Sequence, residues 1–162
     1  MSKEAILKAR TEMKKVVEDL VAEAREIIDD YWIEWRVKNK ELGALENAEP
    51  GKSKYLRGNI APRITVRTGK HYLEWVFYGP GRYGSKNKSW GDRIQPRKGP
   101  YYHLSQFKKA QDWEYELIET AEMKLRYIRY ALESIHTSQI YLKRLIVKIN
   151  QQTDENSEDQ ND

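Results

Sequence analysis

Residues 60–78 of the 162-residue chain read IAPRITVRTGKHYLEWVFY, and this stretch decides the fold. Two runs rich in β-branched and aromatic residues, 60–68 and 71–78, flank the dipeptide Gly69-Lys70. Such runs are typical of β-strands, and glycine at the first central position suits a two-residue type II′ turn. The stretch therefore predicts an antiparallel β-hairpin.

This turn also predicts a strand register, in which Arg67 lies opposite Tyr72 and Arg63 lies opposite Val76. Because side chains alternate along a strand, the register divides the hairpin into an apolar face and a polar, basic face. The apolar face holds Ile64, Val66, Leu73, Trp75 and Phe77, and the polar face holds Arg63, Thr65, Arg67, Tyr72 and Glu74. A single register divides the side chains of both strands into these two faces, which supports both strand predictions. We expect the apolar face to pack on helices.

Long helical patterns lie on either side of the hairpin. Before it, apolar residues from Met13 to Trp35 recur every three or four positions, which predicts a helix over about 3–40 that ends before Gly43. After it, the alternation of three and four from Leu125 onward is a heptad seam, within a helix predicted over about 105–149.

The segments between and beyond these elements complete the predicted organisation. A third strand is expected near 89–95, within a β-rich basic insert over about 60–103. Residues 150–162 are polar and acidic, so a disordered tail is expected there. Residues 1–149 then form a single domain.

The predicted fold class is α+β, with two long antiparallel helices and a small antiparallel β-sheet inserted between them. Two arrangements of the helices would bury their apolar seams. They pair within one chain as a helical hairpin, or they form a coiled coil between two copies in a homodimer.

Charge is distributed unevenly along the chain. Residues 51–103 hold 12 Lys/Arg against Glu74 and Asp92 alone, whereas the segments before and after are each net acidic. Half of the 18 aromatic residues also lie in this middle segment. A basic segment with interleaved aromatic side chains is typical of a surface that binds a polyanion.

The middle segment therefore predicts a nucleic-acid-binding surface, with DNA favoured over RNA. Its cations would neutralise phosphates, and its tyrosines would stack on bases. The candidate contact residues are Arg63, Arg67, Lys70, Tyr72, Arg82, Tyr83, Lys86, Lys88, Arg93, Arg97 and Lys98. Alanine at both Arg63 and Arg67 is expected to weaken DNA binding and to leave thermal stability nearly unchanged. Alternatives are an acidic protein or lipid headgroups as the partner, or a solvated face without a ligand.

The sequence gives little support for an enzyme or for a cofactor-binding protein. Residues 79–84 read GPGRYG and match the dinucleotide-binding spacing, but no helical pattern follows and no acidic residue lies near position 100. The chain has no cysteine, and its three histidines are not spaced as metal ligands on one element. We expect no cofactor, no metal and no catalytic activity.

The ends and hydropathy of the chain bear on location. The first ten residues carry four charges and no apolar run, and no stretch has the roughly 18 apolar residues of a membrane span. Together with the lack of cysteine, this predicts a cytoplasmic protein without a membrane partner.

Short motifs link the chain to a known family. PRITVR at 62–67, LEW at 73–75, FKKA at 107–110, WEYELI at 113–118 and TAE at 120–122 resemble the MobI family of conjugative-transfer proteins. The resemblance implies an auxiliary factor at the origin of transfer, which helps a separate relaxase to start mobilisation of a plasmid or integrative element. It implies no catalytic residues. The alternative is a non-enzymatic adaptor whose heptad helices recruit a partner such as the relaxase, with the basic segment docking an acidic protein.

Overall fold

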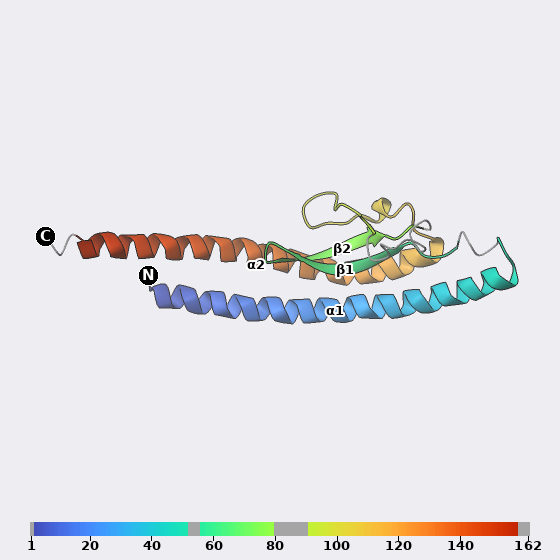
Figure 1. Cartoon of the computed structure of the whole chain (residues 1–162), viewed down its shortest axis with the longest axis horizontal. Helices are drawn as coiled ribbons and strands as arrows, with labels where there is room; N and C mark the ends of the chain where they lie inside the picture. Colours follow the sequence, from blue (N-terminus) through green and yellow to red (C-terminus); the bar gives the residue numbers. More distant parts are fainter. Residues whose placement is uncertain (1, 52–55, 80–90, 159–162) are drawn as a thin grey trace.

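The computed structural model describes residues 2–51, 56–79 and 91–158. Two long helices, α1 (Lys3–Ala48) and α2 (Asp112–Glu158), lie side by side and antiparallel, so that both termini lie at the same end (Figure 1). At that end Arg10 Nε donates to Gln139 Oε1 at 3.3 Å. The two helices thus pair within one chain as a helical hairpin, and the predicted α+β fold class is confirmed.

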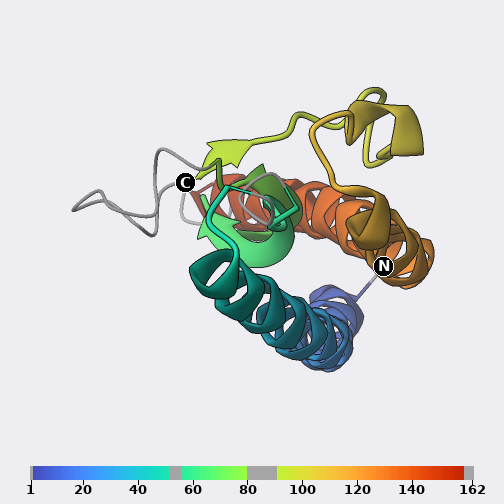
Figure 2. The same cartoon turned by 90° about the vertical axis from the view of Figure 1, so that its right-hand side faces the viewer.

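A three-stranded antiparallel sheet in the order β1-β2-β3 covers part of the helical pair. Its strands are β1 (Ile60–Arg67), β2 (Lys70–Phe77) and the short β3 (Asp92–Arg93). β1 contacts α1 and β2 contacts α2, so the sheet lies across both helices. The third strand falls within the predicted range 89–95. Figure 2 shows the segment that leads from β3 to α2 on the side of the sheet away from α1.

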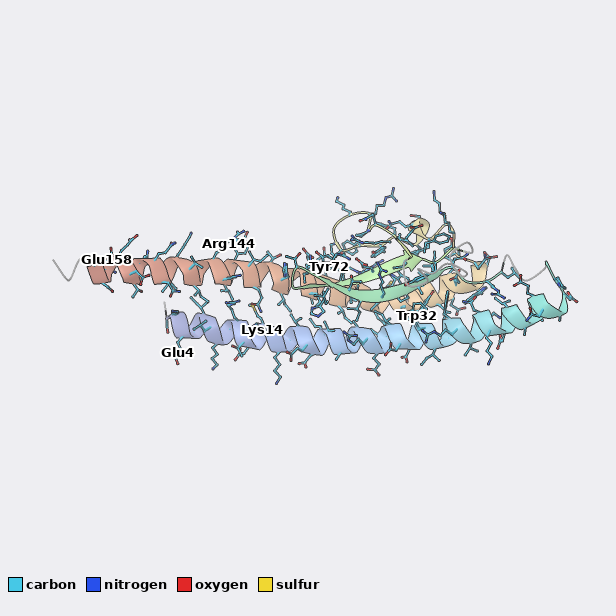
Figure 3. All side chains as sticks on the ribbon, viewed as in Figure 1. Glu4, Lys14, Trp32, Tyr72, Arg144 and Glu158 are labelled. Atoms are coloured by element: carbon cyan, nitrogen blue, oxygen red, sulfur yellow. The ribbon has the colours of Figure 1, made fainter. Side chains whose placement is uncertain are left out.

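The core lies where the sheet meets the helices, and Trp75 is at its centre. The Trp75 ring is fully buried and makes edge-to-face contacts with Tyr31 of α1 at 5.3 Å and with Phe107 at 5.4 Å between centroids. Trp32 Nε1 donates to the Pro62 carbonyl at 2.7 Å, and Figure 3 shows Trp32 between α1 and the hairpin. The inner face of the hairpin therefore packs on the helices, as the alternation of its side chains predicts.

The hairpin turn differs from the prediction by its position. Thr68 and Gly69 are the two central residues, both with positive φ (52° and 73°), which defines a type I′ turn with glycine second. The register shifts by two residues, so that Arg63 lies opposite Glu74 rather than Val76. A shift of two residues changes every cross-strand partner but keeps each side chain on its face. The predicted division into two faces is therefore kept although the predicted register is wrong. Val66, predicted to pack on the helices, is 58% exposed near the turn.

Helix α1 continues past its predicted end, through Gly43 to Ala48. Glycine in a helix interior costs only about 1 kcal/mol relative to alanine. Burial of Leu42 and the Arg57–Glu46 ion pair at 2.9 Å offset this cost. Gly43 also leaves room for the Arg57 guanidinium, which lies 3.0 Å from the position of a Cβ there.

Helix α2 differs from the prediction at both ends. It begins at Asp112 rather than near 105, because the preceding residues form a separate 3-10 turn, η2 (Leu104–Gln106). It continues to Glu158, so residues 150–158 are helical rather than disordered, and 159–162 lie outside the described residues. Once a helix is established, each further residue adds a backbone hydrogen bond at little cost, which explains the extension without burial.

Candidate nucleic-acid interface

The outer face of the hairpin, which points away from the helices, carries the predicted polar residues. Arg63, Thr65 and Arg67 alternate along β1, and Tyr72 and Glu74 alternate along β2. In the observed register Arg63 pairs directly with Glu74, and Thr65 pairs with Tyr72. The strand alternation and the type I′ turn thus bring opposite charges face to face, which stabilises a cross-strand pair.

Three guanidinium groups converge on the single carboxylate of Glu74, which is only 2% exposed. Arg63 Nε lies 3.2 Å from Oε2, Arg93 Nε lies 3.1 Å from Oε1, and Arg67 Nη2 also contacts Oε1. We call this group of four residues the arginine cluster. It carries three positive charges against one negative charge, so a surplus of cations remains on the outer face.

The arginine cluster fixes the charge state of Glu74. Burial of the carboxylate raises its pKa, whereas hydrogen bonds from Arg67 and Arg63 and the charges of Arg67 and Arg93 lower it. The balance holds the pKa of Glu74 below its usual value. Glu74 thus remains ionised at neutral pH and holds the guanidinium groups in place. The arginine side chains are 29–40% exposed, so they keep contact with solvent.

Aromatic and lysine side chains extend this surface toward the hairpin turn. The Arg67 guanidinium lies over the Tyr72 ring at 4.0 Å, and Lys70 Nζ lies 4.9 Å from the same ring. Lys70 also forms an ion pair with Glu133 of α2. The charge of Lys70 is therefore largely used to hold the hairpin on α2, and Tyr72 is positioned beside Arg67.

An open groove of about 440 Å³ runs beside the arginine cluster. Residues 70–74 of β2 form one wall, and the segment 96–102 forms the other. Lys70, Arg93 and Arg129 bring positive charge to this groove, and Glu74 and Glu133 bring negative charge. The groove connects the outer face of the hairpin with the segment that carries Arg97 and Lys98.

Arg97 and Lys98 are exposed on a tight turn at the outer edge of this groove. The turn is closed by a hydrogen bond from Arg97 N to the Tyr101 carbonyl at 3.1 Å and by the bridge between Lys98 and Tyr101. Neither side chain forms an ion pair within the described ranges, 2–51, 56–79 and 91–158. Their charges are available to an external anion.

The chain matches the description "MobI protein" over residues 20–143, which is more than three quarters of its length. It belongs to the MobI family. The match spans the sheet and the parts of both helices that support it. No curated protein and no solved structure matches the chain. Membership of the MobI family assigns the protein to mobilisation, within an accessory family that is not a known enzyme class.

Of the eleven contact residues predicted for this MobI protein, the structure brings four together: Arg63, Arg67, Tyr72 and Arg93. Lys70 contacts the same ring but pairs with α2, and Arg97 and Lys98 lie across the groove. The remaining four, Arg82, Tyr83, Lys86 and Lys88, lie outside the described residues, as does most of the GPGRYG motif.

Two buried glutamates of α2 that the sequence did not single out position the hairpin. Glu114 is fully buried and accepts hydrogen bonds from Trp35 Nε1 at 2.9 Å, from Ile60 N at 3.0 Å and from Asn59 N at 2.9 Å. It thereby joins α1, α2 and the start of β1. Gly58 is required beside it, because a Cβ there would lie 2.7 Å from Glu114 Oε2.

The second, Glu122, is 1% exposed and accepts from Trp75 Nε1 at 2.7 Å and from Arg129 Nη1 at 2.7 Å. Arg129 Nε in turn donates to the Leu73 carbonyl at 3.0 Å, and Nη1 donates to the Pro100 carbonyl at 3.1 Å. Arg129 thus fixes β2 and the segment 96–102 on α2. Glu122 and Arg129 lie seven residues, or two helical turns, apart, so the pair does not have the i, i+3 or i, i+4 spacing by which ion pairs on a helix are usually predicted.

The structure also brings together two histidines that lie far apart in the sequence. His71 at the hairpin turn and His136 of α2 line one pocket of about 340 Å³, together with Lys14 and Glu18 of α1. Within the part of the chain that the structure describes, no group of three or more His, Asp or Glu side chains could hold a metal ion. In that same part, no helix is apolar and long enough to cross a bilayer.

Proposed function

We propose that this MobI protein binds DNA at the origin of transfer and helps a separate relaxase to start mobilisation. The DNA would contact the outer face of the hairpin and the turn that carries Arg97 and Lys98. The observation that carries the proposal is the arginine cluster, in which a buried carboxylate orients three partly exposed guanidinium groups. Family membership supports the setting, because the family acts in mobilisation.

Physical chemistry favours a phosphate backbone as the ligand of this surface. Guanidinium groups bind phosphate oxygens through planar pairs of donors, and a fixed orientation reduces the entropy lost on binding. A two-stranded ribbon is also narrow enough for the major groove of B-DNA, which is about 12 Å wide. The edge strand β1 therefore suits duplex DNA, because its outer-face side chains Arg63 and Arg67 are 29% and 40% exposed and can be directed at the backbone.

The proposal is tested by fluorescence anisotropy with labelled duplex DNA, single-stranded DNA and RNA over a salt series. Duplex binding that weakens steeply as salt rises from about 50 to 200 mM is expected, because phosphate contacts release counterions. Arg97→Ala with Lys98→Ala should reduce the slope of log K against log salt by about two. Both side chains are exposed, so the fold should be unaffected.

A matched control for this pair is Lys8→Ala with Lys15→Ala. These two lysines are exposed on α1, and neither lines the groove beside the arginine cluster. The control removes the same charge and should leave the salt slope unchanged. Equal slopes for the two double variants, or no duplex binding at low salt, would contradict the proposal.

A second candidate function is that of an adaptor that recruits the relaxase or another transfer protein. It is favoured by apolar side chains exposed on the sheet-free arm, which comprises residues 3–13 of α1 and 140–158 of α2. These side chains are Leu7, Ile140, Tyr141 and Val147. A protein that does not bind DNA but co-purifies with the relaxase would support the adaptor function. Sedimentation of the purified chain would test the homodimer expected from the same helices.

A further inference from the structure

A cluster of exposed aromatic residues lies on α2, on the far side of the turn that carries Arg97 and Lys98. Tyr127 is 70% exposed, and Tyr130 and Met123, one turn away on the same side of the helix, are 42% and 49% exposed. Tyr101, from the turn, lies against Tyr130 with 5.1 Å between ring centroids. We call this surface, which also includes Arg126, the tyrosine face.

The tyrosine face is held in place by contacts beneath it. The Arg126 guanidinium lies 5.5 Å from the centre of the Tyr101 ring, and its Nη2 donates to the Tyr102 carbonyl at 3.0 Å. Tyr102 is itself buried and stacks on Phe107. Tyr101 and Tyr130 are therefore presented on a rigid base with ring surface exposed to solvent.

Cations lie close to these rings along the chain. Lys124 and Arg126 lie on the same helix as Tyr127, and Arg97 and Lys98 lie on the turn that carries Tyr101. Three acidic residues of α2 lie near these rings: Glu122 is buried and paired with Arg129, Glu133, one turn after Tyr130, is paired with Lys70, and Glu119 lies one turn before Met123. The surface thus combines exposed aromatic rings with a positive border, which suits an anionic ligand that has flat, stacking groups.

We propose that the tyrosine face binds unpaired bases of single-stranded DNA. Single-strand-binding surfaces combine cations that follow the phosphates with aromatic rings on which bases stack. The cationic border favours this ligand over an apolar protein segment, which would need no positive charge. The proposal rests on the proposed function and extends it to a strand type, because it gives the protein separate surfaces for paired and unpaired DNA.

The turn at 97–101 places the two surfaces next to one another. Gly99 and Pro100 line the groove beside the outer face of the hairpin, whereas Tyr101 lies on the tyrosine face. Arg129 joins the two, since it donates to the carbonyls of both Leu73 and Pro100. DNA with a duplex part on the hairpin and an unpaired part on α2 would therefore contact both surfaces at once.

The test compares the affinity of the full chain for a blunt duplex and for the same duplex with an unpaired oligothymidine tail, by fluorescence anisotropy. The parent protein should bind the tailed duplex more tightly by roughly tenfold. Tyr127→Ala with Tyr130→Ala should abolish this advantage and leave the affinity for the blunt duplex unchanged. Phenylalanine at both positions keeps the rings, so it should keep the advantage.

Tyr141→Ala is the matched control. Tyr141 is 64% exposed on the same helix, about 16 Å beyond Tyr130 at 1.5 Å per residue, and its replacement should preserve the advantage of the tail. A parent protein that binds both duplexes equally would overturn the single-strand proposal and leave the proposed duplex function intact. A double alanine variant that keeps the tighter binding to the tailed duplex would also overturn the single-strand proposal and leave the duplex function intact. So would a double alanine variant that keeps this tighter binding but no longer captures purified relaxase. A parent that binds neither duplex would overturn both.

Discussion

Two buried glutamates of similar exposure, Glu122 and Glu74, are used in different ways. Glu122 lies between α2 and the sheet and meets one cation, Arg129, whose side chain is 10% exposed and whose donors reach two backbone carbonyls. Glu74 lies on the outer face and meets three arginines that remain partly in solvent. The first arrangement balances its charge inside the molecule, and the second leaves positive charge at the surface. The comparison separates a structural ion pair from the surface that we propose binds DNA.

The largest effect on stability is expected at Glu114, a third buried glutamate, which like Glu122 is used inside the molecule. Glu114→Ala should lower the free energy of unfolding by about 3–5 kcal/mol, because it leaves Trp35 Nε1 and the backbone N–H groups of Asn59 and Ile60 buried without an acceptor. Urea denaturation measures the effect. Glu116→Ala, an exposed position on the same helix, should change stability by less than about 0.5 kcal/mol. Equal losses of unfolding free energy at Glu114 and Glu116 would contradict the structural role given to Glu114.

Glu122→Gln should be the next largest change. It leaves the buried Arg129 without a counter-ion, which should cost about 2–4 kcal/mol. Glu74→Gln should cost about 1 kcal/mol or less, because Arg63, Arg67 and Arg93 can turn to water. Urea denaturation of the two variants side by side tests the contrast. A greater loss for Glu74→Gln would reverse the roles given to the two sites.

Glu74 should also make stability depend on pH. Its pKa is lower in the folded chain than in the unfolded chain, so its contribution is fully present above the unfolded value of about 4.3 and is lost as pH falls through the lower folded value. The difference in unfolding free energy between the parent and Glu74→Gln should shrink as pH falls from neutral to about 3. A difference that is constant over this range would show that the arginines do not hold the carboxylate.

The smallest expected effect concerns the hairpin turn that aligns Arg63 with Glu74. Thr68 adopts a left-handed conformation that asparagine accepts more readily, particularly before glycine in a type I′ turn. Thr68→Asn should therefore raise the free energy of unfolding by about 0.5–1 kcal/mol. Thermal and urea unfolding measure the gain. A loss of stability would favour the type II′ turn centred on Gly69-Lys70.

The sequence predicted those features that follow from local periodicity. The alternation in β1 and β2 placed Arg63, Arg67 and Tyr72 on one face, and that placement survived a two-residue error in register because strand faces repeat every two residues. The family resemblance was confirmed by the match over residues 20–143. The end of α1 was wrong because Gly43 is offset by tertiary contacts of Leu42 and Arg57 that no local pattern contains.

The buried glutamates could not be predicted for a related reason. Glu114 and Glu122 stand among charged residues that read as a solvated helix face, and their partners Trp35 and Trp75 lie 79 and 47 residues away. The convergence of three arginines on Glu74 likewise needs β3, which supplies Arg93 from outside the hairpin. Composition indicated a basic surface in this region, but the geometry of the arginine cluster depends on the folded sheet.

The central claim, that the arginine cluster binds DNA, is tested most directly by the salt dependence of duplex binding in two variants. One is Glu74→Gln, and the other carries Arg63→Gln and Arg67→Gln in addition. Removing Arg63 and Arg67 alone would take two of three cations from the buried carboxylate of Glu74, so the expectation that alanine at both positions leaves stability nearly unchanged is wrong. Because Glu74 is replaced in both of these variants, both should fold, which thermal unfolding verifies. We predict that the slope of log K against log salt is smaller by about two in the triple variant, because two phosphate contacts are lost. Equal slopes and equal affinities in the two variants would contradict the account.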